Sequence, residues 1–226
     1  MNWKFIRQAV RANSLFYWVY LLFLVGGAIL LFLIEKGDAI FYFSDRRSEI
    51  GDAAFRFITK LGEEYVYFVA LIGLLLYKYR YAITLPAIGI SVSIFSYFLK
   101  QFFAHDRPSL YFRKLDLLES IQLVDGVRLN GGANSFPSGH TMSAFAFYTF
   151  MVLVLPKKKW IACMGIALAI LVGVSRVYLV QHFFEDIYLG SIIGLALGMF
   201  WYALIENYPK QPHNWMDNSL LSKKQV

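Results

Sequence analysis

The stretch around which the chain is organised is Phe136-Pro137-Ser138-Gly139-His140-Thr141, and it opens a strongly apolar run over residues 142–155. A proline in the first turn of a helix has a preset φ and lacks only an N–H that would have no partner there. The stretch therefore predicts a helix that begins near Pro137, with free backbone N–H groups at residues 138–140. Such a helix end attracts anions, phosphate above all, because of its unpaired donors and partial positive charge. Taken alone, these residues are explained better by an ordinary capped helix, so the case for an anion site depends on the rest of the chain.

The overall composition is that of a membrane protein. Of the 226 residues, 58% are hydrophobic and 16% are charged, whereas soluble domains are about 45–50% apolar and about 25% charged. The chain has no linker-like tract and no internal repeat, so we expect one membrane-embedded domain over residues 1–226. Basic loops and anionic lipid headgroups explain the net charge of +7 better than nucleic acid does. The single cysteine, Cys163, excludes an internal disulfide and a thiolate metal cluster.

Apolar segments that are long enough, or nearly long enough, to cross a bilayer recur along the chain. We expect an all-α, polytopic membrane bundle of six transmembrane helices, at residues 15–34, 65–77, 83–103, 138–155, 160–178 and 185–205. The second segment is short and is expected to borrow a turn from either side. No small-residue cleavage pattern follows the first segment, so we expect no cleaved signal peptide.

Several stretches outside these segments are expected at the membrane surface or in water. Basic and apolar residues at helical spacing predict surface helices at residues 1–14 and 48–61. Residues 207–226 are expected to form a polar, frayed tail. In the longest polar loop, residues 104–136, two β-prone runs flank Asp125-Gly126 and predict a short β-hairpin at residues 121–129. A structured loop of this length is typical of a lid or a specificity element.

Six spans place both ends of the chain on one side of the membrane. The short basic turns at residues 78–80 and 157–159 share that side with Lys4, Arg7 and Arg11, so the positive-inside rule assigns it to the cytoplasm. The first inter-span loop counts against this assignment, because its five basic residues would lie outside. With this topology, the loop after the third span, the start of the fourth span and the turn between the last two spans meet at the outer face.

Ionisable residues gather at that outer face, where a charge beside a membrane span is costly and is by default a functional candidate. The set is Lys100, His105, Asp106, Arg107, His140, Arg176, His182, Glu185 and Asp186. His182 and Asp186 are four residues apart, so on a helix the carboxylate would fix the imidazole tautomer and raise the basicity of the other ring nitrogen. Arg176 adds a planar, permanently charged fork for phosphate oxygens. A structural His–Asp pair beside an interfacial arginine explains this segment equally well.

Lys100 and Arg107-Pro108 straddle the expected end of the third span, where both cations can face one anion. In isolation, two cations that anchor a span at the interface are the simpler explanation. Combined with the helix N-terminus and the two imidazoles, however, the cations can hold a phosphate that one imidazole attacks while the other protonates the leaving oxygen. No carboxylate cluster suggests Mg²⁺ and no His-x-x-x-His spacing suggests another metal, so no cofactor and no metal are expected.

The pattern resembles the type 2 phosphatidic-acid phosphatase (PAP2) superfamily, in its branch of integral membrane lipid phosphatases. That superfamily also includes vanadium haloperoxidases and glucose-6-phosphatase. Its three motifs occur here in order and with the family's spacing: Lys-x6-Arg-Pro at residues 100–108, Pro-Ser-Gly-His at 137–140 and Ser-Arg-x5-His-x3-Asp at 175–186. The six-span layout extends the resemblance over most of the chain.

The resemblance implies a role for each core motif residue. The residues that would bind the phosphate oxygens, by side chain or backbone N–H, are Lys100, Arg107, Ser138, Gly139 and Arg176. His182 would attack phosphorus to give a phosphohistidine intermediate, with Asp186 holding its ring. His140 would protonate the leaving group and then activate water. Ser175 has no evident chemical role and is expected to cap or pack.

The membrane setting favours a lipid phosphate or a polyprenyl diphosphate over a soluble sugar phosphate. A site at the outer face of a bacterial inner membrane suits phosphatidate, phosphatidylglycerophosphate, undecaprenyl diphosphate or lipid A. The motifs touch only the phosphate, so selectivity is expected from the aromatic span ends and from the loop with Arg113, Lys114 and Arg128. Two alternatives stay open: a lipid phosphotransferase of the same fold, and a transporter that binds an anionic lipid without turnover. The sequence predicts no oligomeric state.

Overall fold

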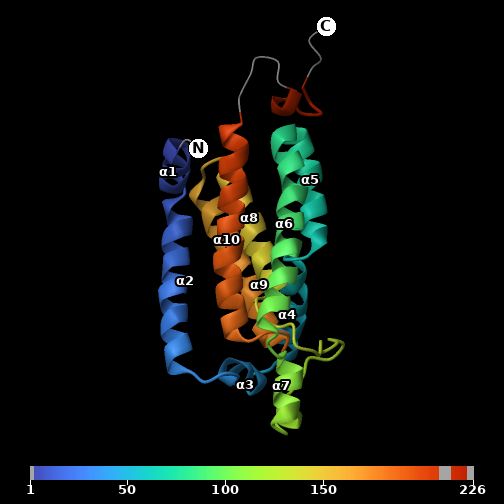
Figure 1. Cartoon of the computed structure of the whole chain (residues 1–226). Coiled ribbons are helices and arrows are strands. Elements are labelled where there is room, and N and C mark those ends of the chain that lie inside the picture. The colour runs from blue at the N-terminus through green and yellow to red at the C-terminus, as the bar shows by residue number, and fades with distance from the viewer. Residues whose placement is uncertain (1–2, 209–214, 223–226) are drawn as a thin grey trace.

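The computed structural model describes residues 3–208 and 215–222, with side chains from Ile6 onward. Within these ranges every regular element is helical, so the predicted all-α class is confirmed. The elements are α1 (Trp3–Ala12), α2 (Ser14–Leu33), α3 (Asp38–Ser44), α4 (Glu49–Lys60), α5 (Glu64–Tyr77), α6 (Tyr79–Phe103), α7 (Pro108–Lys114), η1 (Leu118–Ser120), α8 (Gly139–Val154), α9 (Lys159–Tyr178), α10 (Phe184–Asn207) and η2 (Trp215–Asp217). The long helices run side by side in one bundle (Figure 1).

The predicted apolar segments are all helices, but they differ in length. By length and composition, the described chain has four helical segments fit to cross a membrane: α2, the segment of α6 and α7, α9 and α10. The chain is therefore an integral membrane protein. The remaining two, α5 with 14 residues and α8 with 16, are shorter than the roughly 20 residues that a bilayer core requires. The structure thus bears out four spans, and the count of six stays a prediction.

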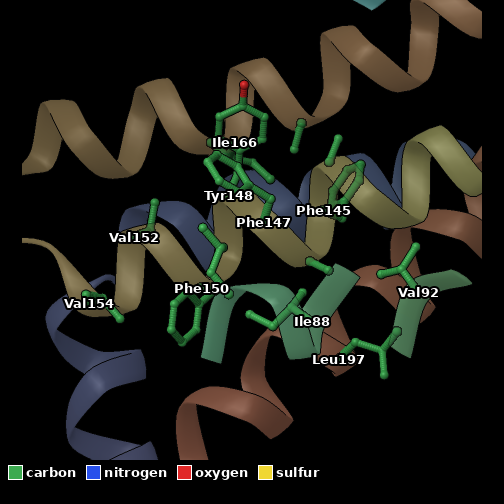
Figure 2. Close-up of a cluster of buried hydrophobic side chains, with 14 of the residues drawn as sticks. Ile88, Val92, Phe145, Phe147, Tyr148, Phe150, Val152, Val154, Ile166 and Leu197 are labelled. Atoms are coloured by element: carbon green, nitrogen blue, oxygen red, sulfur yellow. The ribbon is translucent and has the colours of Figure 1, made fainter. Parts of the chain in front are cut away.

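Helix α8 forms the centre of the bundle. It is apolar on all sides, which is the pattern of a helix surrounded by protein, and most of its side chains are buried. Figure 2 shows Phe145, Phe147 and Phe150 of α8 packed among side chains of neighbouring helices. The neighbours labelled there include Ile88, Val92, Ile166 and Leu197. Because α8 is enclosed by other helices, its length does not have to match the thickness of the bilayer.

A stripe of small residues sets the distance between α10 and α8. Gly190, Gly194 and Gly198 recur every fourth residue of α10, so they share one face. A Cβ atom at Gly194 would lie 2.4 Å from the carbonyl oxygen of Met142, and one at Gly198 would lie 2.6 Å from that of Ala146. No larger residue fits without movement, so the two backbones touch, as small-residue stripes allow in membrane helices. This contact brings the first turns of α8 and α10 together.

The two ends of the bundle carry different short elements. Helix α1 and η2 lie at one end, whereas α3, α4 and α7 lie at the other (Figure 1). The expected frayed tail is wrong for residues 215–222, and residues 209–214 and 223–226 lie outside the described chain. The guanidinium of Arg80 is fully buried and donates to Asp217 Oδ2 at 2.6 Å, and the Tyr79 N–H donates to the Asn218 carbonyl at 2.9 Å. These bonds hold the segment against the start of α6.

The surface helix predicted at residues 48–61 is present as α4, but the predicted β-hairpin is wrong. Ser48 caps α4 by accepting a hydrogen bond from the Gly51 N–H at 3.1 Å. The turn at Asp125-Gly126 forms, yet residues 121–129 contain no strand. The physical reason is that the two flanking runs contact other parts of the protein instead of each other. The Arg128 carbonyl accepts a hydrogen bond from the Gln181 side chain, and Ile121 and Val124 are buried in separate apolar clusters.

Candidate active site

One wall of the candidate site is the turn between α9 and α10. His182 precedes α10, and its Nδ1 lies 3.1 Å from Asp186 Oδ2. The same carboxylate oxygen accepts the Phe183 N–H at 2.9 Å, so Asp186 also caps the first turn of its own helix. Both side chains are buried. The predicted pair is therefore present, although it joins a turn to a helix end instead of lying along a helix face.

Ser135 completes this wall from the long loop before α8. Its hydroxyl donates to Asp186 Oδ2 at 2.5 Å and lies 3.4 Å from His182 Nδ1. The Ser135 N–H in turn donates to the His105 carbonyl at 3.0 Å, which fixes the loop. With Nδ1 directed at Asp186, the Nε2 atom of His182 is the ring nitrogen left for a reacting group.

The protonation state of His182 suits a nucleophile. His182 lies in the turn outside the membrane-crossing helices, and its side chain is almost completely buried. Burial lowers the pKa of His182 to about 4, with Arg176 and Arg107 acting in the same direction and Asp186 opposing them. The imidazole is therefore neutral at neutral pH, and its free nitrogen carries a lone pair.

Three cations converge beside this wall, and each is placed by a different segment. Arg107 donates through Nε to Asn134 Oδ1 at 2.6 Å and through one terminal nitrogen to the Gln181 carbonyl at 3.2 Å. Arg176 donates to Thr59 Oγ1 at 2.6 Å.

The third cation, the Lys100 ammonium, lies over the start of α8, where a Cβ atom added at Gly139 would be 3.9 Å from its Nζ. Among the described residues none of Lys100, Arg107 and Arg176 has a carboxylate partner, and Arg176 Nε is buried with no hydrogen bond. This cluster can therefore bind an anion.

The start of α8 forms the third side of the site, with two corrections to the prediction. Pro137 lies before the helix: α8 begins at Gly139, and Ser138 is its N-cap, since the Ser138 hydroxyl accepts from Thr141 Oγ1 at 3.0 Å and from the Thr141 N–H at 3.4 Å. The Ser138 N–H is not free, because it donates to the Asp186 carbonyl at 3.0 Å. That bond joins the first turns of α8 and α10 and leaves the N–H groups of Gly139 and His140 for an anion.

His140, in the first turn of α8, is held more loosely. Its Nε2 lies 3.6 Å from Glu63 Oε1, and about a third of its side chain is exposed (35%). It is also within electrostatic range of His182 and Arg176. Two cavities meet here: one of about 630 Å³ between α5, α6 and α8, and one of about 690 Å³ beside α4. Both are lined by His140 and Glu63.

Some of the ionisable residues predicted to gather at this face lie outside the site. Asp106 pairs with Lys114 at 2.6 Å, and Glu185 pairs with Lys36 at 2.6 Å. The His105 ring packs against Phe136, with the ring centroids 5.0 Å apart. These contacts are structural and leave the three motifs as the core of the site.

Two further predictions have structural outcomes. The Ser175 hydroxyl donates to the Val172 carbonyl at 2.6 Å in the interior of α9, so Ser175 packs as expected. Of the three cations assigned to selectivity, Arg128 lines the cavity beside α4, whereas Arg113 and Lys114 lie on α7 and line neither of the two cavities.

Several residues that complete the site were missed from the sequence. They are Thr59, Glu63, Asn134, Ser135 and Gln181. Asn134 and Ser135 directly precede the Pro-Ser-Gly-His motif, and this adjacency was an available signal. Thr59 and Glu63 belong to the end of α4 and the turn after it, far from every motif, and no pattern in the sequence marks them. In the described chain no three His, Cys, Asp or Glu side chains lie together as a metal site would require.

Sequence comparisons relate this arrangement to known proteins. The model of the PAP2 superfamily matches residues 66–210, a range that includes all three motifs. Lipid phosphate phosphatase 2 of Arabidopsis thaliana is 36% identical over 96 residues, which cover 37% of this chain and 33% of that protein. Phosphatidylglycerophosphatase B of Bacillus subtilis is 44% identical over 71 residues, which cover 28% of this chain and 35% of that protein. The chain thus spans about a third of the length of these curated relatives.

A solved structure has the same arrangement of helices. The crystal structure of Aquifex aeolicus LpxE superposes with a TM-score of 0.62 at 28% sequence identity. The match covers 74% of this chain and 94% of that one. The similarity therefore extends well beyond the three motifs to most of the bundle.

Proposed function

The chain belongs to the PAP2 superfamily, and on this basis we propose that it is a metal-independent phosphatase that removes a phosphate from a membrane lipid. The observation that carries the proposal is the arrangement of the two imidazoles. His182 is neutral and held through Nδ1 by Asp186, while His140 lies at the start of α8 within electrostatic range of it. Beside them lie cations that have no carboxylate partner in the part of the chain that the structure describes.

In the first step, His182 Nε2 attacks phosphorus and the bond from phosphorus to the leaving oxygen breaks. The positive charge that develops on the imidazole is stabilised by Asp186, which holds the Nδ1 proton. His140, whose imidazolium form is favoured by the negative charge of the bound phosphate, gives its proton to the leaving oxygen, so the lipid product departs as an alcohol or as a protonated phosphate. The product of this step is a phosphohistidine on residue 182.

In the second step, water attacks the phosphohistidine and the bond between nitrogen and phosphorus breaks. His140, now neutral, takes the proton from this water and returns to its starting state. Throughout, Lys100, Arg107 and Arg176 neutralise the charge on the equatorial oxygens, and the Gly139 N–H and the Ser138 hydroxyl donate to them. Because the cations are already held in place, little reorganisation is needed during the reaction.

The cavity between α5, α6 and α8 supports a lipid rather than a soluble substrate. Its wall is mainly apolar and includes Tyr67, Leu71 and Ile90, and its inner end reaches His140. A hydrocarbon chain lying in this cavity would place the ester oxygen beside the proposed general acid. The finer topology belongs to the proposal too: one domain with six spans, both termini in the cytoplasm of a bacterial cell, and the site at the outer face of the inner membrane.

The experiment is a phosphate-release assay in detergent with phosphatidate, phosphatidylglycerophosphate, a polyprenyl diphosphate and a lipid A. We expect release from at least one lipid, inhibition by vanadate and little effect of EDTA. In His182→Ala the rate should fall by about 10⁴-fold or more, because the nucleophile is lost. His105→Ala is the matched control, since this imidazole lies at the same end of the bundle outside the cation cluster; its loss should stay within about tenfold.

Two results would contradict the proposal. The first is unchanged phosphate release in a folded His182→Ala protein, which would exclude the covalent mechanism. The second is lipid binding by the wild-type protein without any turnover, which would favour a transporter. Transfer of phosphate to an added alcohol in preference to water would instead identify a phosphotransferase.

A further inference from the structure

The cavity of about 690 Å³ beside α4 extends well beyond the residues proposed to hold the phosphate that reacts. It lies between the second half of α4 and residues 126–130, and it reaches the candidate site at His140 and Arg176. Its size is within the range of pockets that hold a whole ligand rather than a single ion. A part of the substrate other than the reacting phosphate can therefore occupy it.

The outer wall of this cavity is basic. Arg56 and Lys60 line it from α4, and Arg128 lines it from the facing loop. Arg56 is already engaged, because its guanidinium donates to the Asp125 carbonyl at 3.0 Å and ties the loop to the helix. In the described parts of the chain, the Lys60 ammonium and the Arg128 guanidinium have neither a hydrogen bond nor an ion pair. Two cations thus face the cavity unpaired.

The two cavities that meet at His140 differ in what they can accept. The one between α5, α6 and α8 is mainly apolar, and its charged residues besides His140 are the carboxylates Glu63 and Glu64. A second phosphate in that cavity would lose water and meet negative charge, which is costly. The cavity beside α4 shares Glu63 but lacks Glu64, and it adds the two free cations Lys60 and Arg128 together with Arg176, so positive charge is in excess there. The balance of charge therefore favours an anion on the α4 side.

We propose that this basic cavity binds a second anionic group of the substrate, so that the protein acts on lipids whose headgroup carries another phosphate beside the one removed. This inference rests on the proposed phosphatase function and narrows its substrate class. Lipids with two phosphates would be preferred over phosphatidate, which has only one. The second phosphate lies on the leaving-group side, next to His140, and accepts hydrogen bonds from Lys60 and Arg128.

The test compares two lipids with identical acyl chains, diacylglycerol diphosphate and phosphatidate, each as initial rates in neutral detergent micelles. The variants are Lys60→Ala, Arg128→Ala and the double variant. Both side chains are exposed, and the loop at residue 128 is anchored by its backbone carbonyl, so the variants should fold. We expect the double variant to lose about tenfold or more in kcat/KM for the diphosphate and less than about twofold for phosphatidate.

Arg113→Ala is the matched control, because it removes one exposed cation from the same end of the bundle without touching the cavity. It should change neither rate by more than about twofold. Equal losses on both lipids in the double variant would mean that the cations only attract negative charge in general, and would overturn the inference. No loss on either lipid would overturn it as well.

The outcomes also separate this inference from the proposed function. If the wild-type protein releases no phosphate from either lipid or from the wider panel, the phosphatase proposal fails and this inference fails with it. If the wild-type protein is active and the ratio of the two rates does not change in the double variant, only the inference on the second phosphate fails.

Discussion

The two histidines of the candidate site are held in opposite ways. His182 is buried, and its Nδ1 lies between Asp186 at 3.1 Å and Ser135 at 3.4 Å. His140 is partly exposed, and its nearest ionic contact is Glu63 at 3.6 Å, longer than a hydrogen bond. The first arrangement fixes one tautomer and one orientation before the substrate arrives. The second leaves a ring that can meet both a leaving group and a water molecule at the junction of two cavities.

This difference suggests a division of labour. A nucleophile benefits from being preorganised in a dry environment, because its reacting atom must lie in line with the leaving oxygen. A group that first donates a proton and then removes one from water needs access to both partners. If this division holds, substitutions around His182 should slow the reaction more than substitutions around His140.

The largest effect in the comparison is expected for Asp186→Asn. The substitution keeps the volume but removes the charge that stabilises the Nδ1 proton of His182, so turnover should fall by about 10³–10⁴-fold. The measurement is phosphate release from the preferred lipid, with circular dichroism as a check on folding. Ser135→Ala is the milder partner, because it removes one neutral donor and should cost about tenfold. If Ser135→Ala cost as much as Asp186→Asn, the carboxylate would not be the main support of His182.

A smaller effect that depends on the substrate is expected for His140→Ala. Loss of the proton donor should slow release of a lipid alkoxide by about 10²–10³-fold, since that leaving group needs protonation. The loss should be much smaller in the first turnover of an aryl phosphate whose phenolate leaves unaided. Stopped-flow detection of the phenolate gives this first turnover directly. Equal losses for both leaving groups would remove the role of general acid from His140.

The smallest effect is expected from moderate acid. The lowered pKa of His182, about 4, means that the ring is neutral above this value and gains a proton as the pH falls through it. Attack by His182 should therefore lose less than about half its rate between pH 7 and pH 5, and should fall steeply below about pH 4. The measurement is phosphoenzyme trapped by an alkaline quench after a short exposure to substrate. A midpoint near 6.5, the ordinary value for histidine, would show that burial does not control the ring.

The apolar segments predict most of the helices, and the motifs predict most of the residues of the candidate site. Hydrophobic runs of sufficient length dictate helices in a bilayer, so the helices from α2 to α10 that contain them were located within a few residues. The predicted topology and the motif resemblance point to Lys100, Arg107, His140, Arg176 and the 182–186 pair, and the fold places them within electrostatic range of one another. Their roles in catalysis stay predictions.

Long-range contacts explain what was missed. The predicted hairpin does not form because carbonyls around Asp125 accept hydrogen bonds from Arg56 of α4 and from Gln181. No local sequence pattern reveals these long-range partners, which outweigh the local β preference. The contact that holds residues 215–222 is not visible in the sequence, because Arg80 lies far along the chain from its partner Asp217. Glu63 and Thr59 enter the site only because α4 packs against α9, a pairing that periodicity cannot predict.

The glycine stripe of α10 has a consequence for how freely the rest of the sequence can change. Two helices that meet through side chains change their separation whenever a core residue is exchanged, because a different rotamer fills a different volume. Where Gly194 meets the Met142 carbonyl, the contact is between backbones, which have no rotamers. Apolar residues elsewhere in the bundle can therefore be exchanged for one another while the hydrogen bond from Ser138 to Asp186 keeps its length. The spacing of the two helices that carry the site is thus set by three glycines, Gly190, Gly194 and Gly198, which have no side chain.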